Sequence, residues 1–237
     1  MKLTADLIAS SSTYINAIKD RELDLSDSNI SVIENLGATR DLNDSLNLCH
    51  NNIRILGNFP TLDRLQCLYL ADNRIAAVER DLAQFLPRLR TLVLSNNDIG
   101  DLVDLEPLRL FECLEILSLV NNPVMSKKNA RLWCIWRMSP SLRVLDFERV
   151  RQAERSEAKR LFEAKDGTPS DLANSILNVK SSAPSVANTF EPGEGLDHVA
   201  AAKEKTAEEL QKEQSIADLK ARIREEMAQV QAMEEYI

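Results

Sequence analysis

An eight-residue pattern, LxLxxNx(I/V), recurs along this chain of 237 residues and restricts what the chain can fold into. Two leucines alternate with variable residues, and an asparagine follows (a serine in the first copy). Five segments fit without gaps and begin at Leu23, Leu46, Leu68, Leu92 and Leu117. A sixth segment, LDF from Leu145, starts the pattern with Phe147 as its second apolar residue and does not complete it. Repeats in register indicate a protein made of stacked units.

The alternation within each copy predicts a short strand, because every second residue of a strand faces the same side. Both leucines should therefore point into a core that neighbouring repeats share. Prolines at 60, 87, 107 and 140 precede the next strand, where a short helix suits better than a strand. The sequence predicts an α/β leucine-rich repeat solenoid, with a curved parallel sheet on its concave face and short helices or 3₁₀ turns on its convex face.

The asparagine of the pattern has a structural interpretation. A chain that turns at the end of every strand leaves backbone groups inside the stack, and a carboxamide can both donate to and accept from them. Four repeats carry this side chain, as Asn51, Asn73, Asn97 and Asn122. We interpret them as a structural ladder and not as catalytic residues.

The chain divides into three parts by composition. Residues 1–165 should form the repeat domain with helical caps, of which residues 1–20 would be one amphipathic helical segment with Leu3, Leu7, Ile8, Ile15 and Ile18 on its apolar face. In the second cap, Trp133 and Trp136 precede a charged helix over 148–162; we expect them to pack internally, the alternative being a stacking platform for bases. Residues 166–198 are rich in Ser, Pro, Gly, Ala and Thr, which predicts a flexible linker. Residues 199–237 favour a tail helix that docks on a partner.

Recognisable catalytic and metal-binding motifs are missing from the sequence. There is no GxGxxG, GxxxxGK[ST], GxSxG or HExxH, and the cysteines show no zinc-ligand spacing. Cys49 and His50 are adjacent, but neighbours in a strand face opposite sides. No apolar run has the length of a membrane span. We expect neither an enzyme nor a cofactor, a metal site or a membrane contact.

The outward positions of the strands form a candidate protein-binding surface. The first row is acidic, and the middle rows are small or apolar with one tyrosine. A helix about 10 Å wide could lie there with its apolar face on Tyr69, Val93 and Val120. The alternative is a set of solvated strand faces. The candidate contacts are Glu22, Asp24, Asp27, Asn47, Cys49, Tyr69, Ala71, Val93, Ser95, Ser118 and Val120.

The net charge of −8 is unevenly distributed. Residues 1–126 hold 11 Lys and Arg against 18 Asp and Glu, a net charge of −7, whereas residues 127–165 hold 11 against 5, a net charge of +6. An acidic body argues against a protein that coats nucleic acid along its whole surface, and leaves a local contact through the basic segment.

Four segments are more specific than the leucine pattern: RELDLSDSNISVIENLGATRD (21–41), NNIRILGNFP (51–60), NNPVMSKKNARLWCIWRMSPSLRVLDFERVRQAER (121–155) and TFEPGEGL (189–196). Together they resemble the U2 small nuclear ribonucleoprotein A-prime family over roughly residues 1–165. The resemblance implies a non-enzymatic scaffold of the spliceosome in the nucleus. Its partner would be the B-double-prime protein, whose RNA-recognition domain lays a helix on the concave face and binds a stem-loop of U2 snRNA in pre-mRNA splicing.

The resemblance also implies contact with the RNA backbone near the end of the repeat domain. The candidates are Lys127, Lys128, Arg149 and Arg151, with ordinary surface charges as the alternative. The tail would contact other spliceosomal proteins. An alternative function is a regulatory leucine-rich subunit that binds a phosphatase or a basic nuclear protein without RNA.

Overall fold

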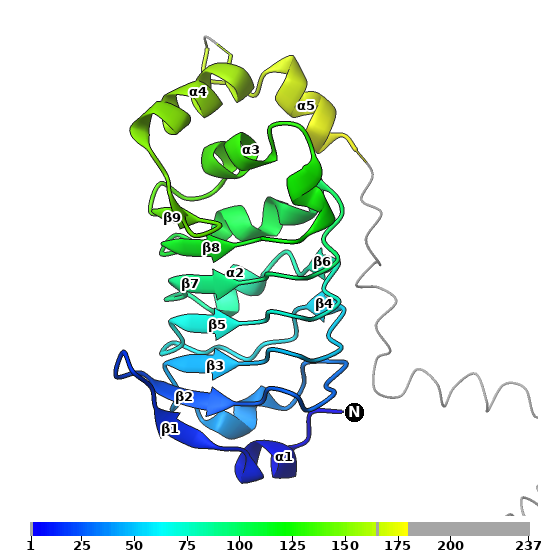
Figure 1. Cartoon of the computed structure of the whole chain (residues 1–237), viewed down its shortest axis with the longest axis vertical. Helices are drawn as coiled ribbons and strands as arrows, with labels where there is room; N and C mark the ends of the chain where they lie inside the picture. Colours follow the sequence, from blue (N-terminus) through cyan, green and yellow to red (C-terminus); the bar gives the residue numbers. More distant parts are fainter. Residues whose placement is uncertain (1, 165, 180–237) are drawn as a thin grey trace, which may run out of the picture. The chain divides into compact units, whose positions relative to one another are not determined.

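The computed structural model describes residues 2–164 and 166–179. The strands stack in a single ladder with helical segments on the opposite side (Figure 1). The eight-stranded sheet consists, in spatial order, of β1 (Thr13–Ile15), β2 (Arg21–Asp24), β3 (Ser45–Asn47), β5 (Cys67–Tyr69), β7 (Thr91–Val93), β8 (Ile116–Ser118), β9 (Val144–Leu145) and β10 (Glu148–Arg149). Strands β2 to β9 pair in parallel, and β1 and β10 are antiparallel to their neighbours.

The leucines of the pattern lie in register across the parallel strands. Leu23 pairs with Leu46, Leu46 with Leu68, and the alignment continues to Leu145. These leucines, and the second leucine of each complete repeat, are at most 2% exposed. Since one repeat cannot bury its own apolar side, this shared row forms the core. The predicted leucine-rich repeat solenoid is confirmed.

The return segments form the convex side. They contain 3₁₀ and α-helical turns at η1 (Leu36–Thr39), α2 (Leu82–Phe85), η2 (Leu102–Leu110) and η3 (Pro123–Ser126). Between two of the repeats the convex side instead holds a small parallel pair, β4 (Ile55–Leu56) with β6 (Ala77–Val78), which the leucine pattern does not predict.

The first cap differs from the single helix expected over residues 1–20. Helix α1 spans only Ala5–Ser10, and the chain then forms the β1–β2 hairpin. The hydroxyl of Ser11 donates to the carbonyl of Leu7 (2.6 Å), which satisfies the last turn and ends the helix. Ile15 and Ile18, which the helical pattern assigns to a buried face, are 65% and 64% exposed.

The second cap consists of α3 (Ala130–Arg137), α4 (Gln152–Phe162) and α5 (Asp171–Leu177). Trp133 is fully buried, and Trp133 and Trp136 pack on Phe162 with ring centroids 5.2 and 5.5 Å away, so the expected internal packing is confirmed. Helix α4 begins at Gln152 and not at residue 148, because Glu148 and Arg149 form β10.

Helix α5 lies in the segment that we expected to be a linker. Its Ala173 is fully buried, and Ile176 packs against the core. The linker prediction is thus not met for residues 171–177, where apolar side chains find a docking site that composition does not reveal. Residues 180–198 of the expected linker and the expected tail helix over 199–237 lie outside the described residues.

Phe147 is turned away from the core position that the pattern assigns to it. Asp146 and Phe147 both adopt left-handed backbone conformations, with φ of 53° and 64°, and the chain reverses into β10. The ring of Phe147 is consequently 77% exposed. The expectation that its position continues the row of second leucines is wrong, because the sixth repeat ends in a hairpin.

Candidate protein-binding face

The outward positions of β2 to β9 alternate with the buried leucines and form one surface, which we call the concave face. It consists of Glu22, Asp24, Ser45, Asn47, Cys67, Tyr69, Thr91, Val93, Ile116, Ser118 and Val144, followed beyond the strand ends by Ser26, Cys49, Ala71, Ser95 and Val120. The backbone ladder fixes these side chains relative to one another, so the surface is defined before any partner binds.

The middle of the concave face is a partly exposed apolar strip. Tyr69 and Val93 are direct neighbours in the β5–β7 register, and both are half-buried, as is Val120. Burial, with Cys67 close by, raises the pKa of Tyr69 to about 12. Its phenol is therefore neutral at physiological pH and presents an aromatic ring with one hydroxyl, a combination common at protein interfaces.

The acidic end of the concave face is only partly available to a partner. Both carboxylate oxygens of Glu22 are occupied, since the phenol of Tyr14 and the amide of Asn16 each donate to it at 2.9 Å, and its side chain is buried. Asp24 is half-buried and accepts from the hydroxyl of Ser26 (2.7 Å). Asp27 is exposed and has a φ of 53°. The predicted contact Glu22 thus holds the hairpin.

Other predicted contacts also have partners within the chain. The carboxamide oxygen of Asn47 accepts from the backbone N–H of Cys49 (3.1 Å). The hydroxyls of Ser95 and Ser118 are 2.8 Å apart, and Ser118 is only 2% exposed. Ala71 and Ser95 are half-buried. These side chains line the surface, and Ser118 has little area left for contact.

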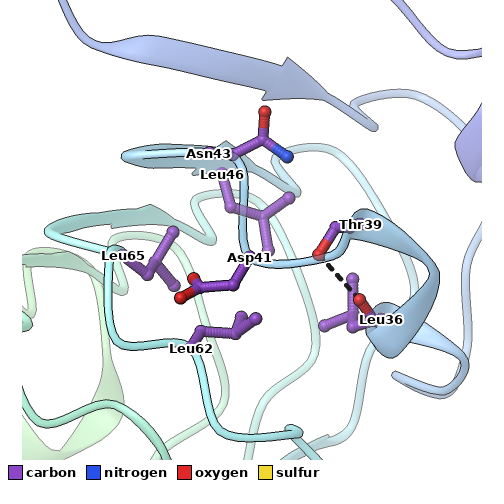
Figure 2. A pocket seen from close by; sticks show the side chains of 7 residues that line it. All are labelled: Leu36, Thr39, Asp41, Asn43, Leu46, Leu62 and Leu65. Atoms are coloured by element: carbon purple, nitrogen blue, oxygen red, sulfur yellow. Dashed lines mark hydrogen bonds between the residues drawn. The ribbon is translucent and has the colours of Figure 1, made fainter.

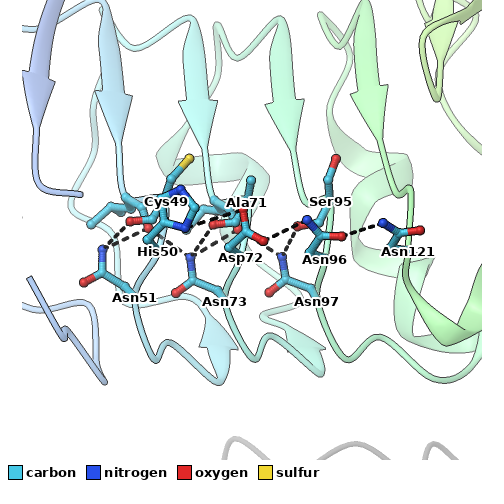
Figure 3. A network of polar contacts seen from close by, with 12 residues as sticks. Cys49, His50, Asn51, Ala71, Asp72, Asn73, Ser95, Asn96, Asn97 and Asn121 are labelled. Carbon is cyan, nitrogen blue, oxygen red and sulfur yellow. Dashed lines mark hydrogen bonds and ion pairs between the residues drawn. The ribbon is translucent and has the colours of Figure 1, made fainter. Parts of the chain in front are cut away.

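The four pattern asparagines form a buried inner ladder beneath the strand ends, and Figure 3 shows three of them, Asn51, Asn73 and Asn97. In each, the carboxamide oxygen accepts from a backbone N–H of the preceding repeat and the nitrogen donates to backbone carbonyls. Asn73, for example, accepts from Ile53 (3.1 Å) and donates to Leu48 (2.9 Å) and Leu70 (3.2 Å). Asn51, Asn97 and Asn122 repeat this arrangement. The inner ladder ties each turn to the one before it.

A second, outer ladder runs beside the first and escapes the sequence analysis (Figure 3). Asn121 donates to Asn96 (2.7 Å), Asn96 donates to Asp72 (2.8 Å), and Asp72 lies 3.6 Å from Nδ1 of His50. Each of these residues precedes an inner-ladder asparagine and has a φ between 55° and 58°. Residues that tolerate the left-handed region, Asp, Asn and His, recur at this position, and that recurrence is the signal that could have revealed it.

The concave face offers no activated nucleophile. Burial raises the pKa of the Cys49 thiol, and burial is also the main reason why the pKa of the Cys67 thiol is raised. Both thiols are therefore protonated at neutral pH, which is the unreactive form. His50 pairs with Asp72 and not with a thiol. Among the residues that the structure describes, no three His, Cys, Asp or Glu side chains gather as a metal site would require.

A small pocket lies inside the stack near the first repeats (Figure 2). Its volume is about 10 Å³, room for roughly one water molecule and too little for a substrate. The lining residues are Leu36, Thr39, Asp41, Asn43, Leu46, Leu62 and Leu65.

The four basic candidates are placed differently. Lys127 forms an ion pair with Asp101, whereas Lys128, Arg149 and Arg151 are exposed. Arg149 lies opposite Val144 in the β9–β10 pair, and directly opposed residues share a face, so Arg149 projects on the concave side.

Glu148, which strand alternation assigns to the outward row, lies on the other side of the β9–β10 pair. It is opposite the buried Leu145, and its carboxylate is 3.7 Å from the guanidinium of Arg131.

Within residues 2–164 and 166–179, no helix combines the length and apolarity needed to cross a membrane.

Comparison with known proteins identifies the class of this fold. A family model described as leucine-rich repeat matches residues 1–176, and the chain is a leucine-rich repeat protein. It is 44% identical to the human U2 small nuclear ribonucleoprotein A' over 196 residues, which cover 83% of this chain and 73% of the human protein. It is also 44% identical to the Schizosaccharomyces pombe protein of that name over 181 residues, 76% of this chain and 75% of the relative. The chain belongs to the U2 small nuclear ribonucleoprotein A' family.

A solved structure is similar over the same region. The crystal structure of the Drosophila melanogaster SNF/U2A' complex contains a chain with 42% sequence identity and a TM-score of 0.70. The match covers 74% of the present chain and 99% of the Drosophila chain. That relative was therefore crystallised together with a protein partner.

Proposed function

We propose that this protein is a non-enzymatic scaffold of the U2 small nuclear ribonucleoprotein in the nucleus. It binds a helix of the RNA-recognition domain of the B-double-prime protein on its concave face and so supports binding of a U2 snRNA stem-loop in pre-mRNA splicing. The observation that carries the proposal is the partly exposed apolar strip of Tyr69, Val93 and Val120 on a rigid sheet. The complex formed by the Drosophila relative supports a protein occupant.

The charges around the apolar strip support a partner helix with both apolar and basic residues. Asp24 and Asp27 lie at the end of the concave face formed by the first repeat, and Asp27 is exposed. Lysines or arginines of the partner would meet these carboxylates. Such rim charges steer association and set orientation more than they add affinity.

The mechanism that fits this surface is preorganisation. The inner ladder fixes each strand against the next, so the backbone of the concave face loses little conformational entropy when the partner binds. A bound RNA-recognition domain would in turn be held in one orientation, which restricts the RNA that it accepts. Lys128, Arg149 and Arg151 would add contacts to the RNA backbone.

The test measures partner affinity by titration calorimetry with the full chain and the partner's RNA-recognition domain. Tyr69→Asp and Val93→Asp should each weaken binding at least about tenfold, because a partner helix would bury the new carboxylate without a counter-charge. Leu110→Asp is the matched control, since Leu110 is a 43% exposed apolar residue on the convex side in η2. Equal affinity in all three variants would contradict the concave-face proposal.

A ribonuclease-treated pulldown from nuclear extract separates this proposal from the alternative of a regulatory subunit. The scaffold should co-purify with U2 snRNA before treatment. Recovery of a phosphatase or a basic nuclear protein, with no RNA in the untreated sample, would favour the regulatory subunit.

A further inference from the structure

Phe147 has the greatest exposed fraction, 77%, among the exposed large hydrophobic side chains of the described residues. The repeat pattern would place an apolar side chain at this position in the core, as it does for Leu94 and Leu119, which are fully buried. The sixth repeat instead turns the ring into solvent at the tip of the β9–β10 hairpin.

The backbone at this tip is unfavourable for phenylalanine. Two-residue hairpin turns with both central residues left-handed are typically Asn-Gly or Asp-Gly. Asp146 fits such a turn, and its carboxylate accepts from the backbone N–H of Leu119 (2.5 Å). Phe147 takes the place of the glycine with a φ of 64°, a conformation that is rare for a bulky side chain. Strain together with exposure at one residue points to a functional constraint and not to a requirement of folding.

The hairpin that carries the ring holds exposed basic side chains as well as the acidic Asp146 and Glu148. Arg149 is two residues further on and projects on the concave side. Arg143 lies on the other strand of the same hairpin, where its backbone carbonyl accepts from the N–H of Val150. The side chain of Arg143 is 76% exposed. Arg143 also approaches Glu115 at 3.7 Å. Glu148 points to the other side, toward Arg131. The hairpin thus combines an exposed aromatic ring with the exposed guanidinium groups of Arg143 and Arg149, in a segment of net charge +6, and this combination is complementary to nucleic acid.

We propose that the ring of Phe147 stacks on an unpaired base of the RNA, with Arg149 beside the adjacent phosphates. This inference rests on the proposed function, in which RNA is bound next to the concave face. Single-stranded bases commonly stack on aromatic side chains, whereas a duplex offers no free base face. The tryptophans considered above do not offer this ring, because Trp133 is fully buried and Trp136 packs on Phe162.

The experiment uses the full chain, the partner's RNA-recognition domain and a fluorescein-labelled hairpin RNA that carries the U2 snRNA stem-loop. Fluorescence anisotropy gives the affinity of the RNA for the protein pair, with Phe147→Gly, Phe147→Leu and Phe147→Tyr in parallel. The glycine variant relieves the backbone strain, so it should unfold at the same temperature as the native protein or a higher one. Its RNA affinity should nevertheless fall about 5- to 100-fold, the effect of losing one stacked base.

The other two variants identify what the ring contacts. Leucine keeps an exposed apolar side chain without an aromatic face and should lose affinity as glycine does, whereas tyrosine should retain it within about twofold. Equal RNA affinity for the native, glycine and leucine proteins would overturn the proposal. The proposal would also be overturned if the glycine and leucine variants bound the partner domain more weakly than the native chain does in the absence of RNA, since Phe147 would then anchor a protein. If the native chain does not change RNA affinity at all, the proposed function itself fails.

Discussion

The side chain of Asn97 joins its own repeat to the backbone of Ile75 in the repeat before it. Its carboxamide oxygen accepts from the N–H of Ile75 at 2.8 Å, and its nitrogen donates to the carbonyls of Leu70 at 2.9 Å and Leu94 at 3.0 Å. Asn97 is only 4% exposed, so water cannot replace these bonds. One amide therefore satisfies three buried backbone groups from two repeats.

Asn97→Ala should lower the free energy of unfolding by about 1–3 kcal/mol, because buried backbone groups lose their partners. Urea titration followed by circular dichroism measures the change. Asn96→Gly is the matched control: Asn96 is the exposed neighbour in the outer ladder, and glycine keeps its left-handed backbone. If both variants lose the same stability, burial of the inner ladder is not the cause.

Tyr14→Phe should destabilise the first cap by about 0.5–1.5 kcal/mol, since it removes the hydrogen bond to Glu22. Partner affinity should stay within twofold, because the phenol points to Glu22 and not to the apolar strip. Calorimetric titration and thermal unfolding of one sample give both values. A large loss of partner affinity at unchanged stability would mean that the hairpin itself is part of the binding surface.

Acid should weaken the second cap through Glu154. The hydrogen bond from Arg131 (2.8 Å) holds the pKa of Glu154 below its usual range. A carboxyl whose pKa is lowered by folding stabilises the protein above its unfolded pKa, about 4.3, and loses that contribution as the pH falls through the folded pKa. Glu154→Gln should lower stability at pH 7 and flatten the decline of stability below pH 5. Glu157→Gln, exposed on the same helix, serves as the control in denaturant titrations from pH 3 to 7.

Ionisation of Asp146 should change the stability of the fold in the opposite direction to that of Glu154. Burial raises the pKa of Asp146 despite its hydrogen bond from Leu119. Ionised Asp146 therefore reduces stability at neutral pH, and this cost disappears as the pH falls through the raised folded pKa. Asp146→Asn keeps an acceptor and tolerates the left-handed backbone, so it should increase the free energy of unfolding at pH 7. The increase should vanish toward pH 3; a gain that does not depend on pH would show that ionisation is not responsible.

The salt dependence of RNA binding tests the basic candidates. Replacing Lys128, Arg149 and Arg151 with Gln should flatten the slope of log affinity against log salt by about 2 to 3 for the ternary complex, if each contacts one phosphate. Lys127→Gln should change the slope less, because Lys127 is already paired with Asp101. Fluorescence anisotropy at several salt concentrations gives the slopes. An unchanged slope for the triple variant would show that these residues are ordinary surface charges that do not contact the RNA.

The strands and the core could be predicted from the sequence because their signal is local. Alternating leucines and a repeat length set the register, so Leu23 and Leu68 were assigned to the core without a structure. The caps depend on contacts between distant residues. Leu3, Leu7 and Ile15 have helical spacing, yet residues 13–15 pair with β2, a partner that helical periodicity does not consider.

The candidate site could be predicted in outline and not in detail. Strand alternation correctly put Tyr69 and Val93 on one surface. It could not show that Glu22 is held by Tyr14 and Asn16, or that Glu148 and Phe147 leave the outward and inward rows. Those outcomes follow from a hairpin at each end of the sheet, where backbone angles and not side-chain alternation decide the direction.

The two antiparallel end strands also limit the length of the array. A further repeat of the same kind would add a parallel strand, and β1 and β10, which run in the opposite direction to the strands that they cover, occupy the two edges where it would pair. They are short as well, three and two residues long, and short edge strands are poor templates for addition. Both edges of the sheet are therefore poor sites for the addition of a second copy, and the strands between β1 and β10 set the length of the concave face.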